Sequence, residues 1–188
     1  NTLAASIVPA IPDALSLAPG ASEMKSEPSL ALESISPLII IYLFGYLVPF
    51  CMATTLTTQA SCGTRVFPSL VTKEVSSLTA NELNYKYRPD GWTIQQVVGH
   101  CIDSHMNSIV RFKLALTEHN PTIRPYEEAQ WAELSDTVNY SIKSATALLV
   151  GIHQRWVFLL EQLDSVQLKK TYIHPDGNEL VSLEQSIA

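Results

Sequence analysis

The clearest pattern of hydrophobic and polar positions lies between Thr93 and Glu118, where apolar residues recur every three or four positions. Thr93 and Gln96 fit a capping box, in which each side chain satisfies a free amide at the helix start. The pair Asn120-Pro121 predicts the end, because a residue before proline is biased away from helical backbone. We expect a helix of about 26 residues and about 39 Å. Its apolar face comprises Ile94, Val97, Val98, Cys101, Ile102, Ile109, Phe112 and Leu116.

Two further stretches show helical spacing. The stripe from about Thr137 to Leu163 steps by three and four residues, and it comprises Ile142, Ala145, Leu149, Ile152, Trp156, Leu159 and Leu163. Residues 67–83 predict an earlier helix, from Phe67 to about Ser77 or Leu78, followed by one short turn. The connection 121–136 is too long for a simple hairpin loop, so we expect it to cross the bundle and pack its aromatic residues.

The last elements are a hairpin and a helix start. Tyr172–Val181 predicts a short β-hairpin with its turn at Asp176-Gly177, and Ser182 with Gln185 forms a second capping box. An isolated helix this short is marginal in water, and three amphipathic helices leave an apolar seam that a fourth would cover. We therefore expect a sequence cut before its last helix. The alternative is a C-terminal turn that packs on the bundle.

These elements predict an all-α protein, a helical bundle with a short β-hairpin before the last helix. The first 63 residues differ from the rest, because they hold five of the 30 charged residues but six of the 11 prolines. Prolines this frequent disfavour a long helix. We divide the chain into an N-terminal extension, residues 1–63, that is disordered or non-native, and one helical domain, residues 64–188.

An apolar run at residues 37–54 lies inside this extension and admits three interpretations. A membrane helix needs about 17–25 apolar residues, whereas Leu38–Ala53 has 16 and contains Gly45 and Pro49. The run is therefore either a short membrane anchor or a buried, poorly folded segment. The third interpretation, which we favour, is that translation begins natively at Met52 and yields one domain of ordinary size.

Composition narrows the class of protein. The chain has 12 basic and 18 acidic residues, a net charge of −6, which argues against a nucleic-acid-binding protein. Hydrophobic residues make up 46% of the 188 positions, enough to build a core. The three cysteines form no CxxC pair and no even set, which favours a reducing, cytoplasmic location. Membrane anchoring through residues 37–54 is the alternative.

Candidate chemistry is sparse, because the five histidines form neither an HExxH motif nor a pair four residues apart. His100 falls on the core side of the capped helix, and Gly99 is expected to open space beside it. Asp103 lies three residues further and is placed to accept a ring N–H. A single histidine on an apolar face is more often a core residue than a metal ligand, so both interpretations stay open.

The remaining histidines suggest structural roles. His105 lies in a polar patch of the same helix, and we expect it on the helix surface or in a hydrogen-bond network. We expect His153 to partner a neighbouring loop. His119 suits a helix C-terminus, whereas His174 has no evident partner. Cys101 is expected to be an inert core residue.

One stretch, 87–118, closely resembles the YfiT-type branch of the DinB-like superfamily. The resemblance covers roughly two-thirds of the chain, from about Phe67 to Ala188, and fades before Phe67. Its further segments are Asn120–Tyr126, Trp131–Leu134, Leu148–Leu149, His153–Trp156 and His174–Gly177. It implies a four-helix bundle with its fourth helix largely missing from this chain.

The resemblance also implies a divalent metal ion, zinc or nickel, held by three histidines. One of them matches His100 in the pattern Val97-Val-Gly-His100, although the family often has a second histidine where Gly99 stands. The other two belong to a His-x-x-x-His pair on the fourth helix, which this sequence lacks. Asp103 would then orient His100, and His105 and Trp92 would line the pocket.

The activity implied is that of a metal-dependent hydrolase or a thiol S-transferase, as some family members are bacillithiol S-transferases. The substrate would be a small molecule such as a low-molecular-weight thiol, and the assembly a homodimer. Nucleic acid is not an expected partner. The alternative is a non-catalytic helical module, or a membrane-tethered interaction domain that uses residues 37–54.

Overall fold

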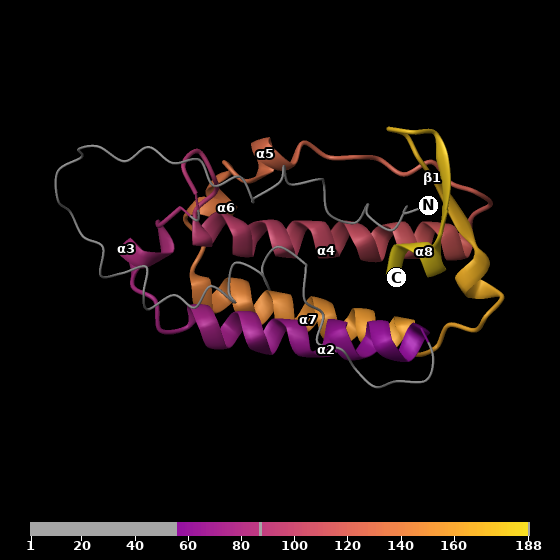
Figure 1. The fold of residues 1–188 in the computed structure, drawn as a ribbon, viewed down its shortest axis with the longest axis horizontal. Helices are drawn as coiled ribbons and strands as arrows, with labels where there is room; N and C mark the ends of the chain where they lie inside the picture. Colours follow the sequence, from indigo (N-terminus) through magenta and orange to yellow (C-terminus); the bar gives the residue numbers. More distant parts are fainter. Residues whose placement is uncertain (1–55, 87, 188) are drawn as a thin grey trace, which may run out of the picture.

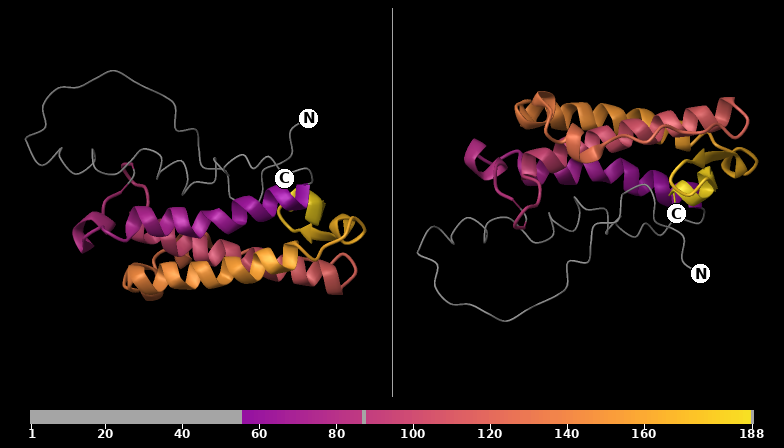
Figure 2. Two further views of the ribbon diagram at one scale, coloured as in Figure 1. Left: turned by 90° about the horizontal axis from the view of Figure 1, so that it is seen from below. Right: turned by 90° about the horizontal axis from the view of Figure 1, so that it is seen from above.

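The computed structural model describes residues 56–86 and 88–187. Three long helices, α2 (Leu56–Val75), α4 (Ile94–Thr117) and α7 (Ile142–Leu160), lie side by side along the longest axis of the molecule (Figures 1 and 2). The shorter elements are α3 (Ala80–Leu83), α5 (Glu128–Trp131), α6 (Ser135–Val138), η1 (Gln167–Lys169), β1 (Thr171–His174), β2 (Glu179–Ser182) and α8 (Leu183–Ile187). The expected helical bundle with a two-stranded hairpin is confirmed.

Helix α4 forms where the sequence predicts it. The Thr93 hydroxyl accepts from the Gln96 amide at 3.1 Å, and the Gln96 side chain accepts from the Thr93 amide at 2.9 Å. Both bonds of the predicted capping box are thus present. The helix ends at Thr117, and Asn120 then takes a left-handed backbone conformation, with φ of 45°, before Pro121.

Two helix starts differ from the prediction. The first long helix begins 11 residues before the expected Phe67 and contains Pro68, and it ends at Val75. The stripe expected to start at Thr137 is split between α6 and α7. The Gln95 side chain explains this break, because its amide donates to the carbonyls of Thr137 and Tyr140, both at 3.0 Å. These are carbonyls that a continuous helix would have satisfied itself.

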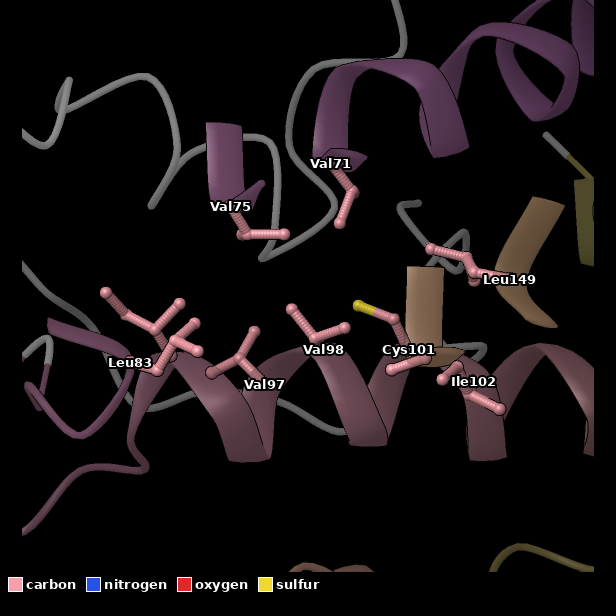
Figure 3. Close-up of a cluster of buried hydrophobic side chains, with 10 residues drawn as sticks. Val71, Val75, Leu83, Val97, Val98, Cys101, Ile102 and Leu149 are labelled. Atoms are coloured by element: carbon pink, nitrogen blue, oxygen red, sulfur yellow. The ribbon is translucent and has the colours of Figure 1, made fainter. Parts of the chain in front are cut away.

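The core is divided into two clusters. In the first, valines of α2 face α4 and meet Leu149 of α7 (Figure 3). Its buried members are Val71, Val75, Leu83, Ile94, Val97, Val98, Cys101, Ile102, Ala145 and Leu149. The second cluster lies at the hairpin end of the bundle and comprises Phe112, Ala115, Ile123, Trp156, Leu160, Tyr172 and Leu183. The predicted apolar faces of α4 and α7 therefore supply most of the core.

The hairpin is antiparallel, with Tyr172 opposite Val181. Its turn contains Asn178 at φ of 50°, a left-handed conformation that asparagine tolerates well. The predicted capping box follows, since the Ser182 hydroxyl accepts from the Gln185 amide at 3.1 Å and the Gln185 side chain accepts from the Ser182 amide at 2.8 Å.

The crossover, residues 121–136, which was expected to cross the bundle, runs along the length of α4 and is held at both ends (Figure 1). At its start, the Ile123 amide donates to the Ile173 carbonyl at 3.0 Å, and the Ile173 amide donates to the Pro121 carbonyl at 2.8 Å. Near its end, the Gln96 side chain donates to the Ala132 carbonyl at 3.0 Å. Its aromatic rings Tyr126 and Trp131 pack together, with centroids 4.5 Å apart.

Gly99 has a different role from the one expected. A Cβ atom at this position would lie 2.5 Å from Thr137 Cγ2. The absent side chain therefore lets α6 approach α4 closely, and it does not open space beside His100. The Thr137 side chain thus occupies the place that a side chain at position 99 would take.

The apolar run at residues 37–54 lies outside the described residues. Helix α2 includes residues 56–63, which were assigned from the sequence to the N-terminal extension. The division of the chain into two parts stays a prediction. Within residues 56–86 and 88–187, every helix is too short or too polar to cross a membrane.

Candidate metal centre and polar face

His100 lies on α4, partly buried, with its ring centroid 4.8 Å from that of Trp92. Burial lowers the pKa of the His100 imidazole, so the ring is neutral at neutral pH. A neutral imidazole keeps a lone pair on one nitrogen, which is the form that binds a metal ion. Of the residues expected to line the pocket, Trp92 thus lies beside His100, and the role of each stays a prediction.

Asp103 lies one turn further along the helix and is also partly buried. Burial, together with the nearby Asp136 carboxylate, raises the Asp103 pKa to about 6. In the described part of the chain no hydrogen bond joins Asp103 to His100, so the orienting role stays a prediction.

A protein metal site needs several donor side chains close together. Within the described ranges, no group of three or more histidine, cysteine, aspartate or glutamate side chains lies close enough to hold a metal. A neutral, half-buried His100 fits the role of one ligand, but the described residues do not complete a set.

Two other histidines form a chain of hydrogen bonds, here called the histidine relay. His153 Nδ1 lies 2.6 Å from the Thr64 carbonyl oxygen, and His153 Nε2 lies 2.7 Å from His105 Nδ1. A carbonyl only accepts, so His153 Nδ1 must carry the proton. Burial lowers the pKa of both histidines, that of His105 to about 3, so both rings are neutral. His153 Nε2 therefore accepts, and His105 Nδ1 donates to it.

The relay joins three helices, and Pro68 explains why it can. In a helix the carbonyl of residue i accepts from the amide of residue i+4. Pro68 has no amide hydrogen, so the carbonyl of Thr64, four residues earlier, lacks its helical donor. His153, on α7, supplies the missing N–H.

Aromatic rings pack around the relay. Phe67 stacks on His153 with centroids 5.4 Å apart, and it meets the edge of His105 at 5.3 Å. Trp156 lies 5.6 Å from His105. His105 thus belongs to a hydrogen-bond network, one of its two expected settings, and its pocket role stays a prediction. His153 contacts helices, not the loop that we expected.

Two smaller expectations are also settled. His174, for which no partner was evident, lies 3.6 Å from the Asp176 carboxylate through Nδ1. Cys101 is buried in the core as expected, and burial raises the pKa of its thiol to about 12. A thiol with so high a pKa is unreactive at neutral pH, since the thiolate is the nucleophile.

A third group, here called the polar face, comprises Asp103, Arg111, Tyr126 and Glu128. The Tyr126 hydroxyl and Arg111 Nε are buried, yet neither has a hydrogen-bond partner. Burial raises the pKa of Tyr126, and the carboxylates of Glu128 and Asp103 raise it further. Burial also raises the pKa of Glu128, against the influence of Arg111. Of this group, sequence patterns indicated only Asp103. Arg111 lies on α4, and Tyr126 and Glu128 belong to the crossover, whose position along α4 no local pattern predicts.

Comparison with known proteins identifies relatives of the chain. The DinB superfamily model matches residues 66–188. A Bacillus cereus (strain AH820) protein is 49% identical over 112 residues, which are 60% of this chain and 64% of that protein. YfiT of Bacillus subtilis (strain 168) is 44% identical over 120 residues, 64% of this chain and 67% of YfiT. Both are named "Putative metal-dependent hydrolase".

The fold agrees with a solved structure of YfiT from Bacillus subtilis, which has an unusual four-helix bundle topology. The TM-score is 0.69 at 38% identity, over 76% of this chain and 81% of that chain. The chain spans about 64% of the length of the first curated relatives it matches.

Proposed function

The chain belongs to the DinB superfamily, and from that premise we propose that it is part of a metal-dependent hydrolase in which His100 binds the metal ion. The main support for this proposal is the state of His100. Its imidazole is partly buried, neutral and packed beside Trp92. The names of the relatives support metal dependence. The remaining ligands are unassigned, because the described residues gather no set of three potential ligands.

The chemistry divides between the ion and the protein. A divalent ion such as zinc or nickel lowers the pKa of bound water or stabilises a thiolate, so hydrolysis and thiol S-transfer to a small molecule are both within the proposal. Trp92 packs against the His100 ring, with centroids 4.8 Å apart, and would help to position it. Asp103, with a pKa of about 6, can hold or release a proton close to neutral pH. We retain a homodimer as the proposed assembly.

Metal titration tests the assignment of His100. The full chain is titrated with Zn²⁺ and Ni²⁺ by calorimetry, in parallel with His100→Ala and with His119→Ala, an exposed histidine near the end of the same helix. We expect His100→Ala to weaken binding at least about tenfold and His119→Ala to leave it unchanged. Equal affinity in His100→Ala, with helicity retained by circular dichroism, would refute the assignment.

A non-catalytic helical module is the second candidate. It is favoured by the finding that the described residues gather no three potential metal ligands. An assay of turnover of ester, amide and thiol substrates with added metal distinguishes the enzyme from the non-catalytic module. A metal-stimulated turnover that His100→Ala abolishes supports the enzyme, and its absence supports the module.

A further inference from the structure

Two buried hydrogen-bond donors on the polar face lack a partner. Arg111 Nε and the Tyr126 hydroxyl are both shielded from solvent and bonded to nothing. Leaving a buried donor unpaired costs about 1–3 kcal/mol, so such groups in a native protein call for an explanation. A ligand that supplies an acceptor oxygen is one explanation, and the surrounding charges define its chemistry.

The two donors belong to the same face as His100. Arg111 lies 11 residues after His100, about three helical turns, and so projects from the same side of α4. Asp103 lies on the same helix, and Arg111 and Asp103 both act electrostatically on the Tyr126 hydroxyl. The crossover carries Tyr126 over this side, with its ring fixed against Trp131 at 4.5 Å.

Two carboxyl groups complete the setting. Asp103 and Glu128 are partly buried, and both act electrostatically on the Tyr126 hydroxyl. No ion pair within 4.0 Å joins either of them to Arg111 in the part of the chain that the structure describes. Among the described residues, the polar face thus presents two donors without a hydrogen-bond partner beside carboxyl groups that form no ion pair with Arg111, although Arg111 is near enough to Glu128 to act on it electrostatically.

We propose that the polar face binds the α-amino acid group of a small molecule, with its carboxylate on Arg111 and Tyr126 and its ammonium on Asp103 and Glu128. A carboxylate alone would leave the two acidic side chains unpaired. An amine alone would leave Arg111 and Tyr126 unpaired, and phosphate would meet repulsion from both carboxylates. As a statement of substrate class, the assignment rests on the proposed function, because His100 shares this side of α4.

Nuclear magnetic resonance of the metal-free full chain tests the proposal. The ¹⁵N–¹H signal of Arg111 Nε, identified by its loss in Arg111→Lys, is followed during titration with L-alanine, acetate, ethylamine and inorganic phosphate. We expect L-alanine to shift this signal in a saturable manner, with a dissociation constant at least about tenfold lower than that of any other probe. No shift with L-alanine, or equally tight binding of acetate or phosphate, would overturn the proposal.

Conservative variants locate the binding. Tyr126→Phe removes only the hydroxyl and Glu128→Gln removes only a charge, and each should weaken L-alanine binding about tenfold. Tyr140→Phe and Arg155→Lys, both exposed, are matched controls that should bind as the parent does. Unchanged binding in Tyr126→Phe would overturn the proposal. If the chain binds L-alanine but His100→Ala does not weaken metal binding, the site is retained and the proposed function is rejected. If the chain binds metal through His100 but does not bind L-alanine, only this site is rejected.

Discussion

The histidine relay and the polar face both place polar side chains under cover along α4, yet they differ in how those groups are satisfied. In the relay, each hydrogen bond has a donor and an acceptor, from His105 through His153 to the Thr64 carbonyl. On the polar face, Arg111 Nε and the Tyr126 hydroxyl have none. Folding stability selects for satisfied polar groups. The comparison therefore assigns the relay to structure and the two unpartnered donors of the polar face to the proposed ligand, although Trp156 Nε1, whose ring lies beside the relay, is buried without a partner as well.

Removing the relay's central residue should have the largest effect. His153→Ala deletes a side chain that is 2% exposed and leaves both the Thr64 carbonyl and His105 Nδ1 without partners. We expect a loss of about 3–4 kcal/mol in the free energy of unfolding, measured by urea denaturation. His153→Gln keeps one donor and one acceptor and should lose less. Equal losses in the two variants would show that the hydrogen bonds contribute nothing.

Lowering the pH should destabilise the relay, by less than His153→Ala does. The His105 pKa, about 3 in the folded chain, lies below its unfolded value of 6.5, so its contribution is full above pH 6.5 and lost as the pH falls toward 3. Between pH 7 and pH 5 this alone removes about 2 kcal/mol. Urea denaturation at pH 5, 6 and 7 measures the loss.

Asp103 acts in the opposite direction. Its folded pKa of about 6 exceeds the unfolded value of 3.8, so its contribution is full below pH 3.8 and is lost as the pH rises through 6. Asp103→Asn removes this opposing contribution and should make the acid loss steeper. If Asp103→Asn instead loses less stability between pH 7 and pH 5 than the parent does, then Asp103 and His105 do not change the stability in opposite directions as the pH falls.

The smallest effect is expected on the polar face itself. Tyr126→Phe removes a buried hydroxyl that has no partner, so it removes a desolvation cost and no hydrogen bond. The free energy of unfolding should stay within about 0.5 kcal/mol of the parent or rise slightly. A loss above about 1 kcal/mol would mean that the hydroxyl is bonded in solution, and the contrast with the relay would fail.

Local signals predicted the best-defined elements. Helix α4 has an apolar stripe, a capping box and a proline beyond its end, and all three agree. The hairpin likewise has its turn residues and the following capping box. The start of α2 was missed because residues 56–63 are mainly small and polar and show no apolar period. The break before α7 was missed because Gln95, more than 40 residues away, determines it.

The candidate site divides in the same way. His100 and Trp92 are eight residues apart, and the family resemblance singled them out; their site roles stay predictions. The relay unites residues separated by 48 and 89 positions, which no pattern along the chain encodes. The polar face depends on where an irregular crossover places Tyr126, and irregular segments carry no periodicity from which a position can be predicted.

Pro68 and His153 are coupled through a single backbone oxygen, that of Thr64. The proline withholds a hydrogen from the Thr64 carbonyl, and His153, 85 positions later, gives one back. Replacing either residue alone disturbs this hydrogen bond. A residue with an amide hydrogen at position 68 would compete with His153 for the Thr64 oxygen, and without His153 that oxygen has no donor. The expected signature among relatives is covariation, in which a chain that lacks this proline is also free to lose the histidine.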